Sequence, residues 1–179
     1  KQMFAASEAL FAAGLDPAND RCMNLFFSGE LYGGFISFWS ILEGMGATQF
    51  PMTAISNYAT VAKTIIENRV DTLLGMPFYF SQLFDACAKE LKEYGRVKKI
   101  FYGGEHMSPA MVEHYKKEFG IEVVKSAIYG SNDAGPLGYS CTHCEGSVHH
   151  VMTRTQYLEI FKMDEDTPVD KGEIGRLIF

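Results

Sequence analysis

Apolar residues recur with two spacings that alternate from the N-terminus to about residue 125. Met3, Phe4, Leu10 and Phe11 follow helical spacing, and this pattern ends at Gly14. Short apolar runs of strand length lie between such helical segments. Further helices are predicted at 34–45, 57–68, 79–94 and 108–119, and strands at 22–27, 47–50, 72–74, 99–102 and 122–125. The alternation predicts an α/β fold with a largely parallel sheet covered by helices on both faces.

The pattern changes near Gly146, because strand candidates then follow one another without helices. These candidates lie at 148–152, 157–163 and 176–179, and an acidic turn at 164–172 separates the last two. We therefore expect an α/β subdomain over residues 1–145 and a short antiparallel β extension over residues 146–179.

Composition narrows the class of protein. With 179 residues, 47% of them hydrophobic and 21% charged, the chain fits one ordinary globular domain. A net charge of −6 argues against nucleic acid as a partner. The longest apolar region, Leu31 to Leu42, is shorter than the roughly 20 residues of a membrane span, and no signal peptide is apparent, so we expect a cytoplasmic protein without membrane attachment.

The two ends of the sequence suggest that it is part of a longer protein. It starts at Lys1 within a helical pattern and stops at Phe179 within an apolar run that resembles a strand.

Three glycine-bearing segments are predicted to follow strands, at 28–34, 103–105 and 129–133. In parallel sheets, ligands bind outside the carboxyl ends of the strands, and glycine lets a ligand approach the backbone. Asp133, at the end of the third segment, could hold a divalent cation. The alternative is that the glycines only close turns and the carboxylates only cap helices. Neither a lysine-containing phosphate loop nor Gly-x-Gly-x-x-Gly occurs in the sequence.

Cys141 and Cys144 have the spacing of a metal clip, and His149 and His150 follow them. Thiolates and imidazoles at this spacing can hold one tetrahedral zinc ion, which needs four ligands. A pair of free thiols beside surface histidines is the alternative; a redox pair is less favoured, because glycines and a strand candidate follow instead of a helix. Candidates for the fourth ligand are Cys22, Cys87, His143 and the second histidine.

Other reactive or aromatic side chains have simpler interpretations. Cys87 and Trp39 fall within helical patterns and are expected to pack in the core, as are the phenylalanines at 35–38. His114 is expected at the surface, whereas the role of His106, close to the 103–105 segment, stays open.

Several segments, in order along nearly the whole chain, resemble the adenylate-forming enzymes. They are FFSGELYGGF (26–35), GATQFPM (46–52), DTLLGMPFYFSQL (71–83), FYGGEHMSPAMVEHYKKEFGIEVVKSAIYGSNDAG (101–135) and GEIGRLIF (172–179). Within this superfamily the chain is most similar to the phenylacetate–coenzyme A ligase branch. The resemblance implies that it is the central part of the large N-terminal domain and that its last strand leads toward the hinge.

The resemblance also implies roles for individual residues. The implied nucleotide-binding residues are Gly103, Gly104, Glu105, Tyr129, Gly130, Ser131, Asn132 and Asp133. The 103–105 segment would border the adenine, Tyr129 would stack near it, and Asp133 would be the catalytic residue that holds magnesium. The sequence departs from the family motif in two places, because Asn132 replaces Thr or Ser, and Asp133 is one methylene shorter than the usual Glu.

Two further sites follow from the same resemblance. The acyl pocket would be lined by Ser28, Leu31 and Tyr32, and Glu30 nearby would either face solvent or select a polar or cationic substrate. A histidine that follows this loop in related ligases corresponds better to His150 than to His149. The preferred zinc ligands are therefore Cys141, Cys144 and His150.

The implied activity is that of an acid–thiol ligase. A small-molecule carboxylic acid would be activated with ATP and Mg²⁺ and passed to coenzyme A, with zinc in a structural role. The phosphate loop would precede Lys1, while the ribose-binding aspartate and the catalytic lysine would follow Phe179, so residues 1–179 alone should be inactive. Alternatives are an acyl-protein synthetase, a cofactor-adenylating relative, or a non-catalytic zinc-stabilised α/β interaction module. The acid, the acceptor and the oligomeric state stay open, with a homodimer among the alternatives.

Overall fold

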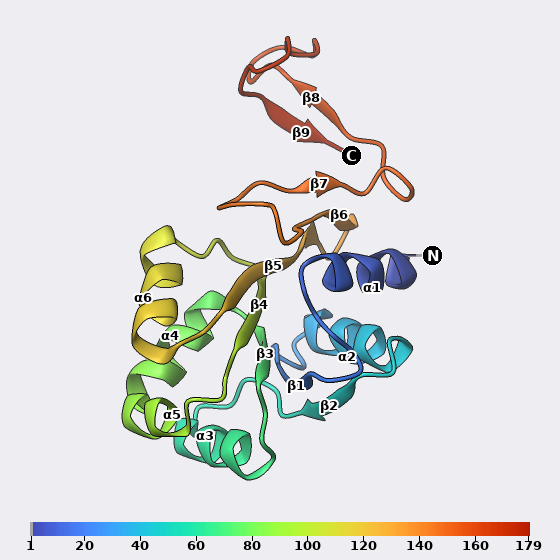
Figure 1. Ribbon diagram of the computed structural model, residues 1–179. Coiled ribbons are helices and arrows are strands. Elements are labelled where there is room, and N and C mark those ends of the chain that lie inside the picture. Colours follow the sequence, from blue (N-terminus) through green and yellow to red (C-terminus); the bar gives the residue numbers. More distant parts are fainter. Residues whose placement is uncertain (1) are drawn as a thin grey trace.

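The computed structural model describes residues 2–179, and Lys1, which begins the predicted helical pattern, lies outside them. Helices and strands alternate through most of the chain (Figure 1). The helices are α1 (Gln2–Ala12), α2 (Gly34–Gly44), α3 (Tyr58–Glu67), α4 (Pro77–Ala86), α5 (Ala88–Tyr94) and α6 (Pro109–Phe119). The strands are β1 (Arg21–Leu25), β2 (Thr48–Pro51), β3 (Thr72–Gly75), β4 (Lys99–Gly103), β5 (Val123–Ser131), β6 (Gly135–Tyr139), β7 (His150–Val151), β8 (Glu159–Phe161) and β9 (Arg176–Ile178).

Seven strands form one sheet in the order β2-β1-β3-β4-β5-β6-β7. The first five in this order pair in parallel, whereas β6 and β7 are added as antiparallel strands at the β5 edge. The strands β8 and β9 form a separate antiparallel pair near the C-terminus. The predicted fold class, a largely parallel sheet followed by an antiparallel extension, is confirmed, although β7 belongs to the main sheet.

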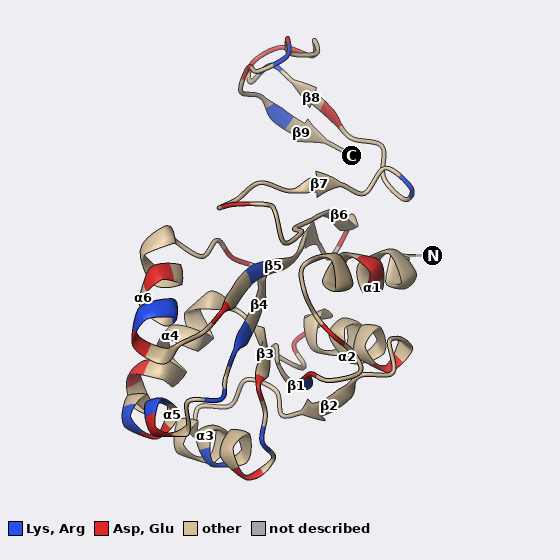
Figure 2. Ribbon diagram, in the orientation of Figure 1, with Lys and Arg blue, Asp and Glu red and all other residues tan. Residues whose placement is uncertain are grey.

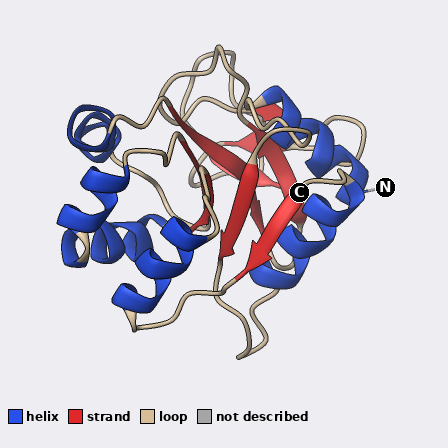
Figure 3. Ribbon diagram, turned by 60° about the horizontal axis from the view of Figure 1, so that its bottom comes forward, coloured by secondary structure: helices blue, strands red, loops and turns tan. Residues whose placement is uncertain are grey.

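Helices cover both faces of the sheet (Figure 3), with α1 and α2 on one side and α3 to α6 on the other (Figure 1). Neighbouring strand residues therefore enter two different cores, because side chains alternate across a strand. Leu73 packs with the α3–α6 layer and Leu74 with the α1–α2 layer. Ile100 and Phe101 of β4 divide in the same way. Phe38 of α2, expected to pack, is buried and stacks on Phe26 with ring centroids 4.3 Å apart.

Helix ends follow ordinary capping chemistry. The Ser108 hydroxyl accepts a hydrogen bond from the Met111 N–H at 3.3 Å, and Pro109 starts α6, as the sequence predicts. Asn57 caps α3 in the same manner through the Thr60 N–H. These caps fix where the connecting loops leave the helices and therefore where the strand ends lie.

Three details differ from the sequence prediction. Residues 135–139 were not predicted as a strand but form β6, because they pair with β5 across a tight hairpin. The helix predicted at 79–94 is two helices, α4 and α5, that meet at Cys87, which is buried as expected. Trp39 was expected in the core but has 37% of its surface exposed, since the buried stripe of α2 runs through Phe38 and Ile41 instead.

Charge is distributed unevenly over the two helical layers. Lys, Arg, Asp and Glu are frequent on α5 and α6, whereas α1 and α2 carry few (Figure 2). Phe4, Phe11 and Ile36 on these two helices are exposed. Among residues 2–179, no helix is long and apolar enough to span a membrane.

Candidate functional site

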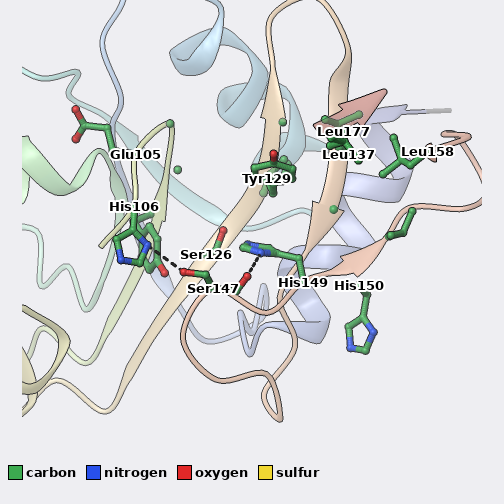
Figure 4. A pocket seen from close by; sticks show the side chains of 17 residues that line it. Glu105, His106, Ser126, Tyr129, Leu137, Ser147, His149, His150, Leu158 and Leu177 are labelled. Atoms are coloured by element: carbon green, nitrogen blue, oxygen red, sulfur yellow. Dashed lines mark hydrogen bonds between the residues drawn. The ribbon is translucent and has the colours of Figure 1, made fainter. Parts of the chain in front are cut away.

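A cavity of about 600 Å³ opens at the carboxyl ends of β4 and β5 (Figure 4). Its volume falls within the range of small-molecule sites. One side, here called the strand wall, consists of Gly103 to Glu105 at the end of β4 together with the Ser126–Gly130 part of β5. The other side, here called the loop wall, is formed by residues 141–150, of which Ser147, His149 and His150 line the cavity. Leu158 and Leu177 of the C-terminal extension also line the cavity.

Glycines in the strand wall bring backbone close to the cavity. Gly104 has a φ of +80°, and a methyl group there would lie 3.4 Å from the Tyr32 hydroxyl oxygen. A methyl group on Gly130 would overlap the carbonyl oxygen of Gly135 and lie 3.1 Å from Pro136 Cα. Glycine at these two positions is therefore a requirement of the local fold, and it also leaves the backbone open to a flat ligand.

Glu105 performs a structural role that the sequence did not reveal. Its Oε2 accepts a hydrogen bond from the Phe78 N–H at 3.1 Å, at the start of α4. A carboxylate at a helix N-terminus satisfies a free N–H and interacts favourably with the helix dipole. The 103–105 segment is therefore held against α4 while Glu105 also lines the cavity.

Two histidines join the loop wall to the strand wall. The Ser147 hydroxyl lies 3.0 Å from His106 Nδ1, and His149 Nδ1 lies 2.8 Å from the Ser147 carbonyl oxygen. The His149 ring lies 5.5 Å from the ring of Tyr129, centroid to centroid. His149 Nε2 is buried, and no group in residues 2–179 forms a hydrogen bond with it. His106, whose role was open, thus contributes to the cavity (Figure 4).

The remaining residues of the predicted nucleotide motif lie at the tip of the β5–β6 hairpin. The Ser131 hydroxyl accepts a hydrogen bond from the Ala134 N–H at 3.1 Å, and Asn132 Oδ1 reaches the start of α2 near Gly33. Asp133 is exposed, and within the described chain its carboxylate forms no hydrogen bond or ion pair. These three residues adjoin the cavity-lining Gly130 in sequence but do not themselves line the cavity.

The predicted acyl-pocket residues occupy a tight turn after β1. Glu30 and Leu31 have φ values of 50° and 63°, a left-handed conformation that costs non-glycine residues energy and is often found at functional sites. Tyr32 reaches Gly104, and burial together with the nearby Glu105 carboxylate raises the pKa of its hydroxyl. Ser28 and Leu31 are exposed, as is Glu30, and none of the three lines the cavity.

Cys141, Cys144 and His150 form a cluster on the opposite side of the loop wall. Cys141 Sγ lies 3.5 Å from Cys144 Sγ and 3.3 Å from His150 Nε2. The hydrogen bond with His150, aided by backbone N–H groups and Cys144, lowers the pKa of the Cys141 thiol to about 6. Among residues 2–179 no further Cys, His, Asp or Glu joins this cluster.

The other fourth-ligand candidates lie elsewhere. Cys22 is buried against the α1–α2 layer, where burial raises its pKa to about 12, and Cys87 is buried in the α3–α6 layer. His149 and His150 point away from each other, so that His149 faces the cavity while His150 faces the cysteines (Figure 4).

Comparison with known proteins decides the family. Residues 14–179 match the family described as AMP-binding enzyme. The chain belongs to the AMP-binding enzyme family. No curated protein matches its sequence.

Solved structures of CoA ligases and an acyl-CoA synthetase share the fold at low identity. A 2-hydroxyisobutyryl-CoA ligase, in complex with an adenylate, superposes with a TM-score of 0.84 at 17% identity over 99% of this chain and 38% of its own. An acyl-CoA synthetase from Brucella canis gives 0.73 at 21% identity, covering 98% and 33% of the two chains. A long-chain-fatty-acid–CoA ligase from Archaeoglobus fulgidus gives 0.65 at 15% identity, covering 98% and 37%. The chain therefore spans about two fifths of the length of the ligase it superposes on with TM-score 0.84.

The structure brings together five of the eight predicted nucleotide-site residues of this AMP-binding chain. These five residues all line the same cavity: Gly103, Gly104, Glu105, Tyr129 and Gly130. Sequence reasoning did not assign Ser126, Ser147 or His149 to it. The sequence did contain a signal for His149. Adjacent residues on a strand point to opposite sides, so a His150 that faces the cysteines implies a His149 that faces the cavity.

Proposed function

We propose that the protein containing this chain activates a small carboxylic acid with ATP and transfers the acyl group to coenzyme A. Within the AMP-binding family, the motifs at 26–35 and 101–135 favour the phenylacetate–coenzyme A ligase branch. The observation that carries the proposal is the cavity at the ends of β4 and β5, lined by five residues of the predicted nucleotide site. Since the chain spans 38% of the length of a ligase of this fold, the proposal concerns the whole protein.

The cavity suits the adenine and its sugar better than the triphosphate. Tyr129 offers an aromatic face, and the backbone at Gly103, Gly104 and Gly130 permits close approach of a planar base. Among residues 2–179, no lysine or arginine lines this cavity, so we expect the phosphates to lie toward the hairpin tip and the segments outside residues 1–179.

Asp133 at this tip is a suitable ligand for magnesium. Mg²⁺ prefers carboxylate oxygen and keeps several waters and substrate phosphates as its other ligands, which an exposed and unpaired carboxylate allows. When bound, the ion would offset negative charge on the phosphates. Asp133 would hold it, while Ser131 keeps the turn in place through its hydrogen bond to Ala134.

The chemistry has two steps. A carboxylate oxygen of the acid attacks the α-phosphorus of ATP, which forms the acyl-adenylate and releases pyrophosphate. The sulfur of coenzyme A then attacks the acyl carbon and displaces AMP. Tyr32, which links the turn after β1 to Gly104, would border the acid where it meets the nucleotide, with Ser28 and Leu31 further along the same turn.

Acid-dependent ATP–pyrophosphate exchange by the full-length protein tests this proposal. We expect exchange with at least one acid from a panel of arylacetic, benzoic and short-chain acids, and thioester formation when coenzyme A is added. Exchange without a thioester would instead indicate an acyl-protein synthetase or a cofactor-adenylating enzyme. No exchange with any acid would reject the proposal and favour a non-catalytic interaction module.

A further inference from the structure

The geometry of the Cys141, Cys144 and His150 cluster points to a function beyond nucleotide binding. We propose that these three side chains bind one zinc-class metal ion, which fixes the loop wall of the cavity. Their ligand atoms all lie within 4.8 Å of one another. The proposal does not depend on the ligase activity, because it concerns only the loop at 141–150 and its contacts.

The spacing of the ligand atoms fits tetrahedral coordination. Zn–S and Zn–N bonds of about 2.3 and 2.0 Å give tetrahedral edges of about 3.8 Å between two sulfurs and about 3.5 Å between sulfur and nitrogen. The observed separations are 3.5 Å between the two sulfurs and 3.3 Å between Cys141 Sγ and His150 Nε2. These two separations match a tetrahedral site to within a few tenths of an ångström, and the third, between Cys144 Sγ and His150 Nε2, is at most 4.8 Å.

The cluster is built into the fold by contacts that do not involve a metal. The Lys125 ammonium donates hydrogen bonds to the carbonyl oxygens of Thr142 and Cys144, and the Thr142 N–H donates to Ala12 O at 3.0 Å. The His150 ring lies 5.0 Å from the ring of Tyr139, its partner residue across β6 and β7. The cysteine turn and the histidine are thus held on separate elements and face one point.

The ligand set selects the class of metal. Two thiolates and one imidazole suit zinc and similar borderline ions rather than magnesium or calcium, which prefer oxygen. Three protein ligands leave one tetrahedral position for a solvent molecule. His150 is exposed, so solvent can reach that position.

A metal at this cluster would act on the cavity through the chain between its ligands. Ser147 and His149 lie between Cys144 and His150, and both line the cavity. The loop at 141–150 buries few apolar side chains, because only Cys144 is buried there. A metal ion would therefore hold Ser147 against His106 and His149 against Tyr129 where packing alone provides little support.

Metal analysis of the full-length protein, purified under reducing conditions, tests the proposal. We expect about one zinc per chain and, after replacement by cobalt, the strong visible absorption of a tetrahedral site with thiolate-to-cobalt bands. His150→Asn removes one of three protein ligands and should leave the purified protein without stoichiometric metal. His143→Asn is the matched control, because His143 lies between the two cysteines in sequence but outside the cluster, and it should keep the metal.

His150 is exposed, so its replacement should not prevent folding, which circular dichroism can check. Chelation should also lower the melting temperature by about 4 °C or more in the wild type and leave His150→Asn nearly unchanged. Reduced wild-type protein that neither carries zinc nor takes up cobalt would overturn the proposal. Equal loss of metal in the two histidine variants, or a Cys141–Cys144 disulfide found by thiol titration of freshly prepared protein, would overturn it as well.

Discussion

The two walls of the cavity are stabilised in different ways. Gly103 and the Ser126–Gly130 part of β5 belong to strands in which side chains such as Phe101 and Ala127 are fully buried between helical layers. The loop wall has no such support, since most residues from 141 to 150 are exposed or half-buried. Its contacts are a few hydrogen bonds, aromatic contacts and the cysteine–histidine cluster.

The two walls therefore meet two different requirements of a binding site, namely fixed backbone positions and polar side chains that can move. The strand wall continues strands that the core fixes in place, so its glycines can present backbone to a ligand at defined positions. The loop wall supplies polar side chains from a segment that can open locally at low cost in free energy. A metal ion at the cluster would be an economical way to order that segment without enlarging the core.

The largest effect is expected from Gly130→Ala in the strand wall. The new methyl group would overlap the Gly135 carbonyl oxygen and crowd Pro136, so the β5–β6 hairpin would have to separate. We expect a loss of about 3 kcal/mol or more in the free energy of unfolding, measured by urea denaturation.

Gly44→Ala provides the control for this change. Gly44 ends α2, has ordinary backbone geometry, and a methyl group there meets nothing within 4 Å. This variant should be neutral or more stable by up to about 1 kcal/mol. Similar destabilisation of the two variants would show that the hairpin is not as constrained as the contacts indicate.

A second test asks whether the hairpin tip supplies chemistry as well as structure. Asp133→Asn in the full-length protein should reduce acid-dependent ATP–pyrophosphate exchange by about 100-fold or more, because the charge that holds magnesium is lost. Stability should change by less than about 0.5 kcal/mol, since the residue is exposed and Asn suits turns as well as Asp does. Exchange at the wild-type rate with saturating magnesium would leave Asp133 as a turn residue only.

Much of the strand wall could be predicted from the sequence. Buried parallel strands are continuous apolar runs, and the glycines that follow them mark the ligand-binding edge. The pattern failed at β6, because Gly-Pro-Leu-Gly-Tyr at 135–139 has the composition of a turn, and pairing with β5 overrides that local preference. The break between α4 and α5 at Cys87 also lacks a Gly or Pro signal.

The loop wall was predicted only in part. Cysteine spacing identified Cys141 and Cys144, since their proximity follows from local sequence. The contacts of Ser147 with His106 and of Glu105 with the start of α4 join residues 41 and 27 positions apart. Such contacts depend on how the sheet brings distant segments together, and no periodicity in a single sequence encodes them.

The most direct test of the difference between the walls is amide hydrogen exchange of the full-length protein with and without a chelator. Removal of the metal should increase exchange at residues 141–150 by at least about tenfold, while β4 and the buried part of β5 change by less than about twofold. The same increase should appear in His150→Asn without chelator and be absent in His143→Asn. Unchanged exchange at 141–150 after verified metal removal, or an equal increase in both walls, would contradict the account.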